Sequence, residues 1–373
     1  MMPLESNKKQ EISEKIAAAT KVAVRGGGTK TALSHNKLTP ADFVLDISEF
    51  QGVVEYEPSE YTITALAGTT LSSLQQTLHQ QGQYLPFDPM WVEQGATVGG
   101  TVASGVSGPG RLRYGGLRDF ILGIRFWDGQ GQDVHGGGKV VKNSAGFDLP
   151  KLFVGSCGRV GILYEVTLKV FPQSPATRTI ACDVEGDSDL RQCLEHLTRR
   201  SFELDALEFL PESVATGTGQ LYVRMAGEEQ AFDAHQEKIV SLLKRSVRSC
   251  EPREATSLWN GIRETRDLAA DELLIKIPTT LGSLTELLPW CAERELKYRV
   301  SVAGQQLWLV WPVDRSIAEL DGYLSRMNLS ALVVHGDLSR ADHESLPALG
   351  VVRGEKLWAH IKRTMDPDHK FGD

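Results

Sequence analysis

Two glycine-rich segments carry the residues whose types and spacing could do chemistry. The first, Arg25–Lys30, reads RGGGTK and directly follows a short apolar run. Consecutive glycines let successive N–H groups point at one anion, and the side chains of Arg25, Thr29 and Lys30 add donors. The spacing fits neither the dinucleotide-binding fingerprint nor the P-loop. This segment therefore predicts either a phosphate site or a plain glycine turn.

The second segment, Gly95–Asp119, reads GATVGGTVASGVSGPGRLRYGGLRD. It has no helical periodicity, so we expect a loop. Backbone with so little side-chain bulk lets a ligand approach closely, and a buried loop needs acceptors for its N–H groups. A large anionic cofactor would supply them, and a solvated linker is the alternative. The regularly spaced Val98, Val102 and Val106 favour the cofactor loop.

Strands and helices on both sides must position these segments. Alternating apolar residues bounded by turn residues indicate strands, and leucines three and four apart indicate a helix. We expect helices at 6–19 and through Leu71, Leu74 and Leu78, strands at 21–24, 43–46, 52–56, 62–67 and 162–170, and a hairpin of 120–127 with 132–135.

Residues 179–334 contain fewer glycines and repeat one order of elements. A strand, a helix, two strands, a helix and a strand occur twice in succession, separated by a helix at 257–267. Two βαββαβ units predict a duplicated ferredoxin-like sheet, and with it an α+β protein. A last helix is expected at 355–365.

Composition excludes several classes of function. The 373-residue chain has a formal net charge of -8, which argues against nucleic acid as a partner. No apolar run reaches the roughly 20 residues of a transmembrane segment, and the mixed-charge start without a long apolar stretch predicts no signal peptide. The five scattered cysteines have no metal-ligand spacing, so we expect no metal held by this chain and a cytoplasmic location, or one peripheral to the inner membrane through partners.

Four segments together resemble a known family. RGGGTK, ATVGGTVASGVSGP, RYGGLRDFILG and VVKNSAGFDLPKLFVGSCGRVGIL are similar, in order and spacing, to the PCMH-type FAD-binding domain of vanillyl-alcohol-oxidase-like flavoproteins. Within it, the glycolate oxidase FAD-binding subunit family also resembles the chain at SLWNGIRE and IKRTMDP. The resemblance is dense over residues 22–172 and sparser beyond.

The resemblance implies a domain plan. It places a two-subdomain PCMH-type FAD-binding domain at residues 1–173, with subdomains of about 1–90 and 91–173. A ferredoxin-like cap domain follows at 174–350, and residues 351–373 form a C-terminal helix that returns to the FAD domain.

The resemblance also implies where FAD binds. Its pyrophosphate would lie over Arg25–Lys30 and the Thr97–Ser107 segment, with Lys142–Asp148 close by. The expected cofactor-binding residues are Arg25, Gly26, Gly27, Gly28, Thr29, Lys30, Asp88, Pro89, Thr97, Gly99, Gly100, Thr101, Ala103, Ser104, Gly105, Ser107, Gly108, Arg118, Asp119, Lys142, Asn143, Gly146, Phe147, Asp148, Gly158, Gly161 and Ile162.

Two departures from the family pattern matter. Relatives that attach FAD covalently place a His directly after the glycine run, whereas this chain has Thr29, so we expect non-covalent FAD. Relatives usually end with an Asn-Pro-Gly segment, whereas this chain ends Lys370-Phe371-Gly372-Asp373. The last contact of the chain with the flavin domain is therefore open.

Oxidising a 2-hydroxy acid needs a clamp for its carboxylate, which the planar fork of an arginine matches. Arg263 in LWNGIRE is the candidate catalytic residue, with Arg266 next. The alternative is a surface helix whose arginines pair with Glu254, Glu264 or Asp267. His335-Gly336-Asp337 is similar to the metal and base segment of the catalytic glycolate oxidase subunit. That segment continues with a further glycine, an Asn and a His, which this chain lacks. We interpret His335 as a strand-end residue and assign no base.

The strong cofactor pattern and the weak catalytic pattern predict a flavin subunit of a complex. The family implies a GlcD-like flavin subunit and a GlcF-like iron–sulfur subunit as partners, with glycolate oxidised to glyoxylate. The alternatives are a self-sufficient FAD-dependent dehydrogenase of glycolate or D-lactate, and a non-catalytic assembly subunit with the same fold.

Overall fold

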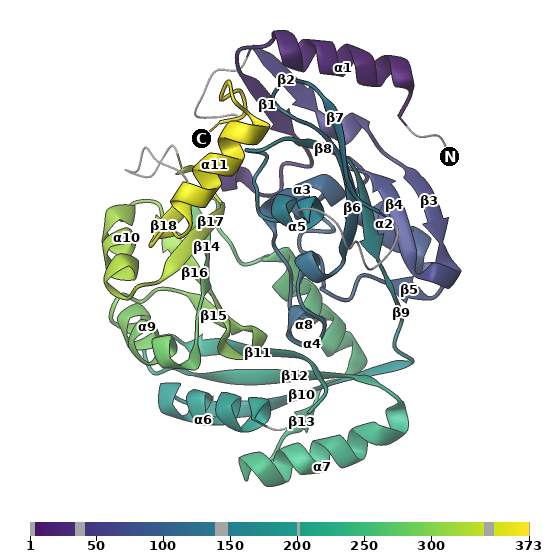
Figure 1. Cartoon of the computed structure of the whole chain (residues 1–373). Coiled ribbons are helices and arrows are strands. Elements are labelled where there is room, and N and C mark those ends of the chain that lie inside the picture. Colours follow the sequence, from purple (N-terminus) through teal and green to yellow (C-terminus); the bar gives the residue numbers. More distant parts are fainter. Residues whose placement is uncertain (1–3, 34–41, 139–147, 200–201, 339–346, 373) are drawn as a thin grey trace. The chain divides into compact units, whose positions relative to one another are not determined.

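The chain forms two compact units in a computed structural model that describes residues 4–33, 42–138, 148–199, 202–338 and 347–372 (Figure 1). Unit 1 consists of Met1–Ser107, Gly116–Gln173 and Arg353–Asp373. Unit 2 consists of Gly108–Gly115 and Ser174–Val352. The second glycine-rich segment is thus divided, because its middle part clusters with unit 2.

Unit 1 begins with a helix and a short parallel pair of strands. Helix α1, Ser6–Ala18, buries Ile12 and Ile16, and strand β1, Val22–Arg25, pairs in parallel with β2, Phe43–Asp46. The Asp42 carboxylate accepts from the amides of Thr20 and Lys21, which fixes the chain as it enters β1. The glycine run therefore directly follows a strand whose start is fixed by hydrogen bonds. The sequence predicts this order of strand and glycine run.

An antiparallel five-stranded sheet forms the rest of unit 1. Its strands follow the order β3-β4-β8-β6-β7. Helix α2, Leu71–His79, buries Leu71, Leu74 and Leu78, and the predicted hairpin is confirmed as β6 paired with β7. The bounds are β3 Val53–Glu57, β4 Thr62–Leu66, β6 Ile121–Trp127, β7 Asp133–Gly137 and β8 Ile162–Lys169; α5 spans Leu149–Phe153, and β5 (Gln83–Tyr84) pairs with β9 (Phe171–Pro172).

The expectation that Gly95–Asp119 has no helix is wrong. Residues Val98–Ser104 form helix α3, and Arg111–Tyr114 form the short α4. The Thr97 hydroxyl caps α3 by accepting from the Gly100 amide, and Gly105 ends it at φ 63°. Two glycines cost this helix about 1 kcal/mol each. Burial of Val98 and Val102, four residues apart, and the cap outweigh that cost.

Unit 2 contains an antiparallel nine-stranded sheet in the order β13-β10-β12-β11-β15-β16-β14-β17-β18. Each predicted βαββαβ unit supplies four neighbouring strands, and the two halves meet where β11 pairs with β15 at Phe209 and Val300. The duplicated ferredoxin-like order is confirmed. The bounds are β10 Ala176–Glu185, β11 Leu204–Ser213, β12 Thr218–Gly227, β13 Arg248–Ser249, β14 Glu272–Pro278, β15 Tyr298–Ser301, β16 Gln306–Pro312, β17 Ser330–His335 and β18 Ala348–Gly350.

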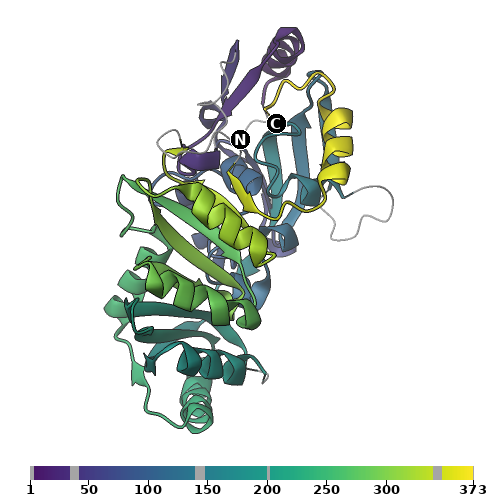
Figure 2. The same ribbon diagram turned by 90° about the vertical axis from the view of Figure 1, so that its left-hand side faces the viewer.

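Four helices of unit 2 bury mainly apolar side chains, and Figure 2 shows their ribbons in teal, green and lime. They are α6 Asp187–Thr198, α7 Phe232–Leu243, α9 Leu281–Glu293 and α10 Ile317–Arg326. Between the halves, α8 spans Pro252–Glu264, five residues earlier than expected, because Pro252 suits a first helical turn. Among the described residues, no helix has the length and apolar character that crossing a membrane requires.

Candidate functional site

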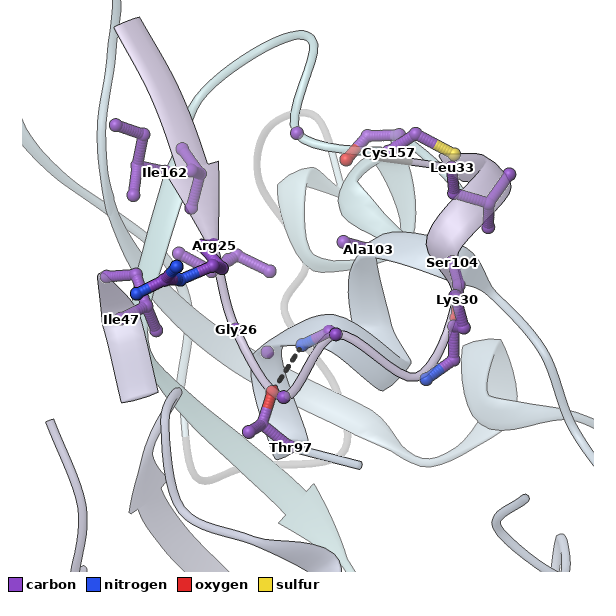
Figure 3. A pocket seen from close by; sticks show the side chains of 18 of the residues that line it. Arg25, Gly26, Lys30, Leu33, Ile47, Thr97, Ala103, Ser104, Cys157 and Ile162 are labelled. Atoms are coloured by element: carbon purple, nitrogen blue, oxygen red, sulfur yellow. Dashed lines mark hydrogen bonds between the residues drawn. The ribbon is translucent and has the colours of Figure 1, made fainter. Parts of the chain in front are cut away.

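Unit 1 contains an open pocket of about 890 Å³, a volume that includes solvent at its mouth. Three walls form it: the end of β1 with the glycine run, helix α3, and a segment leading into β8 (Figure 3). The lining residues are Val24–Lys30, Leu33, Ile47, Thr97, Gly99, Gly100, Ala103, Ser104, Ser156–Gly158 and Gly161–Leu163.

The glycine run forms the first wall because side chains have no room there. A Cβ on Gly27 would lie 2.1 Å from the Gly95 carbonyl oxygen, and one on Gly26 would lie 3.0 Å from Thr97 Oγ1. Gly28 has φ 68° and open space beside it. The amides of Gly26, Gly27 and Gly28 donate to no other described residue. This wall therefore offers backbone donors to a ligand.

Helix α3 forms the second wall and offers shape rather than donors. Its first amides are already used: Val98 donates to the Thr69 carbonyl at 2.9 Å, Gly99 to Ala67 at 2.7 Å, and Gly100 to the Thr97 hydroxyl at 3.2 Å. Glycine and alanine on its exposed side leave the helix backbone accessible. We therefore correct the expectation that the Thr97–Ser107 segment needs an outside acceptor for its amides.

The third wall, Ser156–Leu163, is tied to α3. The Gly155 amide donates to the Val102 carbonyl at 3.0 Å, and the Cys157 amide donates to Ala103 at 2.8 Å. The Ser156 side chain is 1% exposed, and its hydroxyl has no hydrogen-bond partner among the described residues. A buried hydroxyl without a partner is costly, so a polar ligand group at this wall would relieve that cost.

Two cations lie at opposite ends of the glycine run (Figure 3). Arg25 is exposed and donates to the Asp46 carboxylate from Nε at 3.1 Å and from its terminal nitrogen at 2.6 Å. Lys30 Nζ lies 3.1 Å from Thr29 Oγ1 and 5.2 Å from the centroid of the Trp91 ring. Burial lowers the pKa of Lys30 to about 8. At neutral pH its ammonium can attract an anion.

Sequence reasoning missed part of the lining. Val24, Leu33, Ile47, Ser156, Cys157 and Leu163 line the pocket without having been predicted. Ser156 and Cys157 directly precede the predicted Gly158, so the GSCG segment was the available signal. Leu33 and Ile47 carried no such signal, because only folding brings them to the glycine run.

Several predicted residues lie outside the lining, and the structure gives some of them local roles. Ser107 Oγ accepts from the Leu117 amide, Asp119 accepts from the Gly116 amide, and Asp148 caps α5 and pairs with Lys151. The Thr101 hydroxyl is buried without a partner among the described residues. Asp88, Pro89, Gly105, Gly108 and Arg118 are also outside the lining, whereas Lys142, Asn143, Gly146 and Phe147 fall outside the described residues.

The candidate catalytic arginines belong to unit 2. Arg263 is in the last turn of α8, where its guanidinium donates to Asn260 Oδ1 and its Nε is buried without a partner among the described residues. Glu254, one of its alternative partners, pairs with Arg248 instead. Arg266 follows the helix end at Thr265. The carboxylate clamp therefore stays a prediction.

The part of the chain that the structure describes has no group of three or more His, Cys, Asp or Glu placed to hold a metal.

The pocket suits an elongated ligand that carries phosphates. Free amides and a cation line the glycine run, α3 offers a smooth small-residue surface, and the third wall adds a buried hydroxyl. Backbone donors at a glycine run are a common way to bind phosphate oxygens.

Comparison with known proteins indicates which cofactor the chain binds. Residues 6–137 match the family described as "FAD binding domain". Glycolate oxidase subunit GlcE of Escherichia coli K12 is 33% identical over 229 residues, covering 61% of this chain and 62% of that protein. A D-lactate dehydrogenase of Archaeoglobus fulgidus is 29% identical over 243 residues, covering 60% and 54%. Glycolate oxidase subunit GlcD of Bacillus subtilis is 24% identical over 277 residues, covering 70% and 58%. The chain spans less than two thirds of the length of each of these relatives.

A solved alkyldihydroxyacetonephosphate synthase shares the fold, with a TM-score of 0.69 at 15% identity over 100% of this chain and 76% of its own. The α+β fold with an FAD-binding domain is therefore confirmed. The chain carries an FAD-binding domain, and FAD is its cofactor.

Proposed function

We propose that this chain, with its FAD-binding domain at residues 6–137, is the FAD-binding subunit of an oxidase or dehydrogenase of 2-hydroxy acids, with glycolate as substrate. The observation that carries the proposal is the pocket of unit 1, whose free glycine amides lie inside the matched domain. When bound, FAD accepts a hydride from the carbon that bears the hydroxyl group.

The chain's own residues would hold the cofactor. The amides of Gly26–Gly28 and the Lys30 ammonium suit the two phosphates, because donors and a cation stabilise their negative charge. The small residues of α3 leave room for flat parts of FAD, and Ser156 Oγ can donate to a polar group. Thr29 stands where covalently flavinylated relatives have His, so we propose non-covalent FAD.

The substrate class follows from the names of the relatives, which are glycolate oxidase subunits and D-lactate dehydrogenases. Both kinds of substrate are 2-hydroxy acids and carry a carboxylate. We keep Arg263 as the candidate clamp and Arg266 as the second candidate. The reason is the chemistry of the guanidinium, whose planar fork matches a carboxylate.

Electrons accepted by FAD must pass to another carrier. The cysteines of the chain are scattered, and the described ones are all free thiols. We therefore propose a GlcF-like iron–sulfur subunit as the next carrier and a GlcD-like flavin subunit as the second partner. The resemblance to both GlcE and GlcD supports such a complex.

The D-lactate dehydrogenase relative favours a second candidate, a self-sufficient FAD-dependent dehydrogenase of D-lactate or glycolate. A non-catalytic assembly subunit with bound FAD is the third. Absorbance spectra of the purified chain, recorded without oxygen before and after glycolate or D-lactate, separate the three. Bleaching of the flavin by substrate alone would establish a self-sufficient enzyme.

A yellow protein that stays oxidised until the partner subunits are added would support the FAD-subunit proposal. A flavin that no substrate reduces even in the complex would indicate the assembly role. A protein that refuses added FAD would contradict all three. Acid precipitation tests the attachment, because non-covalent FAD is released into the supernatant.

A further inference from the structure

The C-terminal segment of unit 1 buries two lysines. Helix α11, Glu355–Met365, carries Lys362 at 5% exposure, and the tail carries Lys370 at 6% exposure. Burying an ammonium is costly unless its N–H groups are all paired. The partners of the two lysines therefore show what each side chain is holding.

Lys362 joins α11 to the tail and to the pocket. Its Nζ donates to the backbone carbonyl of Arg159 at 2.8 Å, to that of Gly372 at 2.5 Å, and to that of Phe371. It also pairs with Asp366 Oδ2 at 2.9 Å. Asp366 is fully buried and accepts from the amides of Lys370 and Phe371. The ammonium is thus fixed from several sides.

Arg159 lies inside the third wall of the pocket. Gly158 before it and Gly161 after it both line the pocket. Its guanidinium lies 4.8 Å from the centroid of the Trp358 ring of α11. Figure 2 shows α11, in yellow, beside strands of unit 1. The wall is therefore held from one side by α3, through the Gly155 and Cys157 amides, and from the other side by α11.

Lys370 provides a comparison within the same segment. Its Nζ donates to the carbonyls of Ile16 and Ala17 at 3.0 and 2.8 Å, which lie at the C-terminal end of α1. These side-chain contacts do not include the pocket wall. The two lysines are similar in burial and differ in what they hold.

We propose that Lys362 is a positioning residue for the cofactor pocket, which holds the Ser156–Leu163 wall at the distance from α3 that FAD requires. The inference rests on the proposed binding of FAD to this pocket. Lys362 and Asp366 also fasten the tail to α11.

The test compares Lys362→Met with Lys370→Met in the full chain stripped of flavin. FAD affinity is measured by quenching of flavin fluorescence, and the Tm of each apoprotein is recorded. Both variants should lower the Tm, because each removes a buried set of hydrogen bonds. Lys362→Met should weaken FAD binding by about tenfold and change the visible circular dichroism of bound flavin, whereas Lys370→Met should stay within about twofold.

Equal FAD affinity in Lys362→Met and wild type would overturn the inference. The inference would also be overturned if both variants lost FAD affinity in proportion to their loss of Tm. Wild-type protein that binds no FAD would contradict the proposed function instead. If Lys362→Met does not fold, Trp358→Leu takes its place. It removes the ring next to Arg159 and should weaken FAD binding by about threefold, and unchanged affinity would again overturn the inference.

Discussion

In unit 2, the buried Glu208 carboxylate accepts from the Ser301 hydroxyl at 2.6 Å and from the Val302 amide at 3.1 Å. It also lies 3.3 Å from Arg299 Nε, whose terminal nitrogen donates to the Ile262 carbonyl of α8 at 3.1 Å. In unit 1, the amides of Gly26–Gly28 have no described partner. This charge pair of unit 2 thus meets groups of its own chain, whereas the amides of the glycine run in unit 1 are left available.

The difference separates structural from binding roles. A buried charge pair whose members also hydrogen-bond to neighbouring elements fixes the arrangement of those elements, here β11, β15 and α8. A buried hydroxyl such as that of Ser156, without a partner, costs stability until a ligand group meets it. Four variants test this comparison.

Arg299→Met should have the largest effect, because it leaves Glu208 buried without its cation. We expect a loss of about 3–5 kcal/mol in the free energy of unfolding, measured by urea denaturation. The FAD affinity of the folded protein should stay within about twofold. Adding Glu208→Gln should recover part of the stability. A strong loss of FAD affinity without a loss of stability would contradict the structural role.

Gly27→Ala should mainly lower the affinity for FAD, whereas Arg299→Met should mainly lower stability. The new Cβ would lie 2.1 Å from the Gly95 carbonyl oxygen, so the glycine run must move. Overpacking costs up to about 3 kcal/mol, which corresponds to roughly a hundredfold loss of FAD affinity if it displaces the phosphate donors. Flavin content after purification and titration of the apoprotein measure the loss. Gly282→Ala is the control, because its Cβ would meet no atom nearer than 3.7 Å.

Lys30→Met should weaken FAD binding by about tenfold at pH 7 through loss of one cation. Burial lowers the pKa of Lys30 from 10.5 to about 8, so the wild-type side chain is charged below pH 8 and neutral above it. Wild-type affinity should therefore fall as the pH rises through 8, and that part of the slope should vanish in the variant. The stability of the apoprotein should change in the opposite direction, rising between pH 8 and 10.5 as the unfolded chain keeps its proton.

Titration of FAD affinity between pH 6.5 and about 9.5 checks this prediction, with unfolding measured over the same range. Equal pH slopes in wild type and Lys30→Met would show that the Lys30 ammonium does not contact the bound cofactor.

Ser156→Ala should have the smallest effect. Its hydroxyl has no described partner in the apoprotein, so stability should change little, while FAD affinity should fall about threefold to tenfold. Ser301→Ala is the matched control in unit 2. It removes a hydroxyl that Glu208 uses, so it should lower stability and leave FAD affinity alone. A loss of stability without a loss of FAD affinity in Ser156→Ala, and the opposite result in Ser301→Ala, would refute the contrast between the units.

Sequence reasoning succeeded where the signal is local. The RGGGTK run lies at the end of a strand, as expected, because the apolar residues before it and the glycines themselves specify both elements. The duplicated order of strands and helices in unit 2 was also predictable, since alternating and helical spacings of apolar residues report burial directly.

Sequence reasoning failed at α3, where the glycine content outweighed the spacing of Val98 and Val102. That spacing of four residues was the available signal. Position 99 needs a glycine because Ala67 packs against it, so that a Cβ there would lie 2.7 Å from the Ala67 Cβ. Such a contact joins distant residues and leaves no local pattern.

The sequence by itself determined that this protein has an α+β fold, a glycine run after its first strand and, through its resemblance to FAD-binding proteins, FAD as cofactor. These properties depend on residues that act through their own backbone or through near neighbours. The tertiary structure alone decided which amides stay free, that the Ser156 hydroxyl is unpaired, and that Lys362 holds the pocket wall from a position some two hundred residues later in the chain. Whether a polar group is satisfied depends on which distant residues surround it after folding, and one-dimensional spacing does not record that.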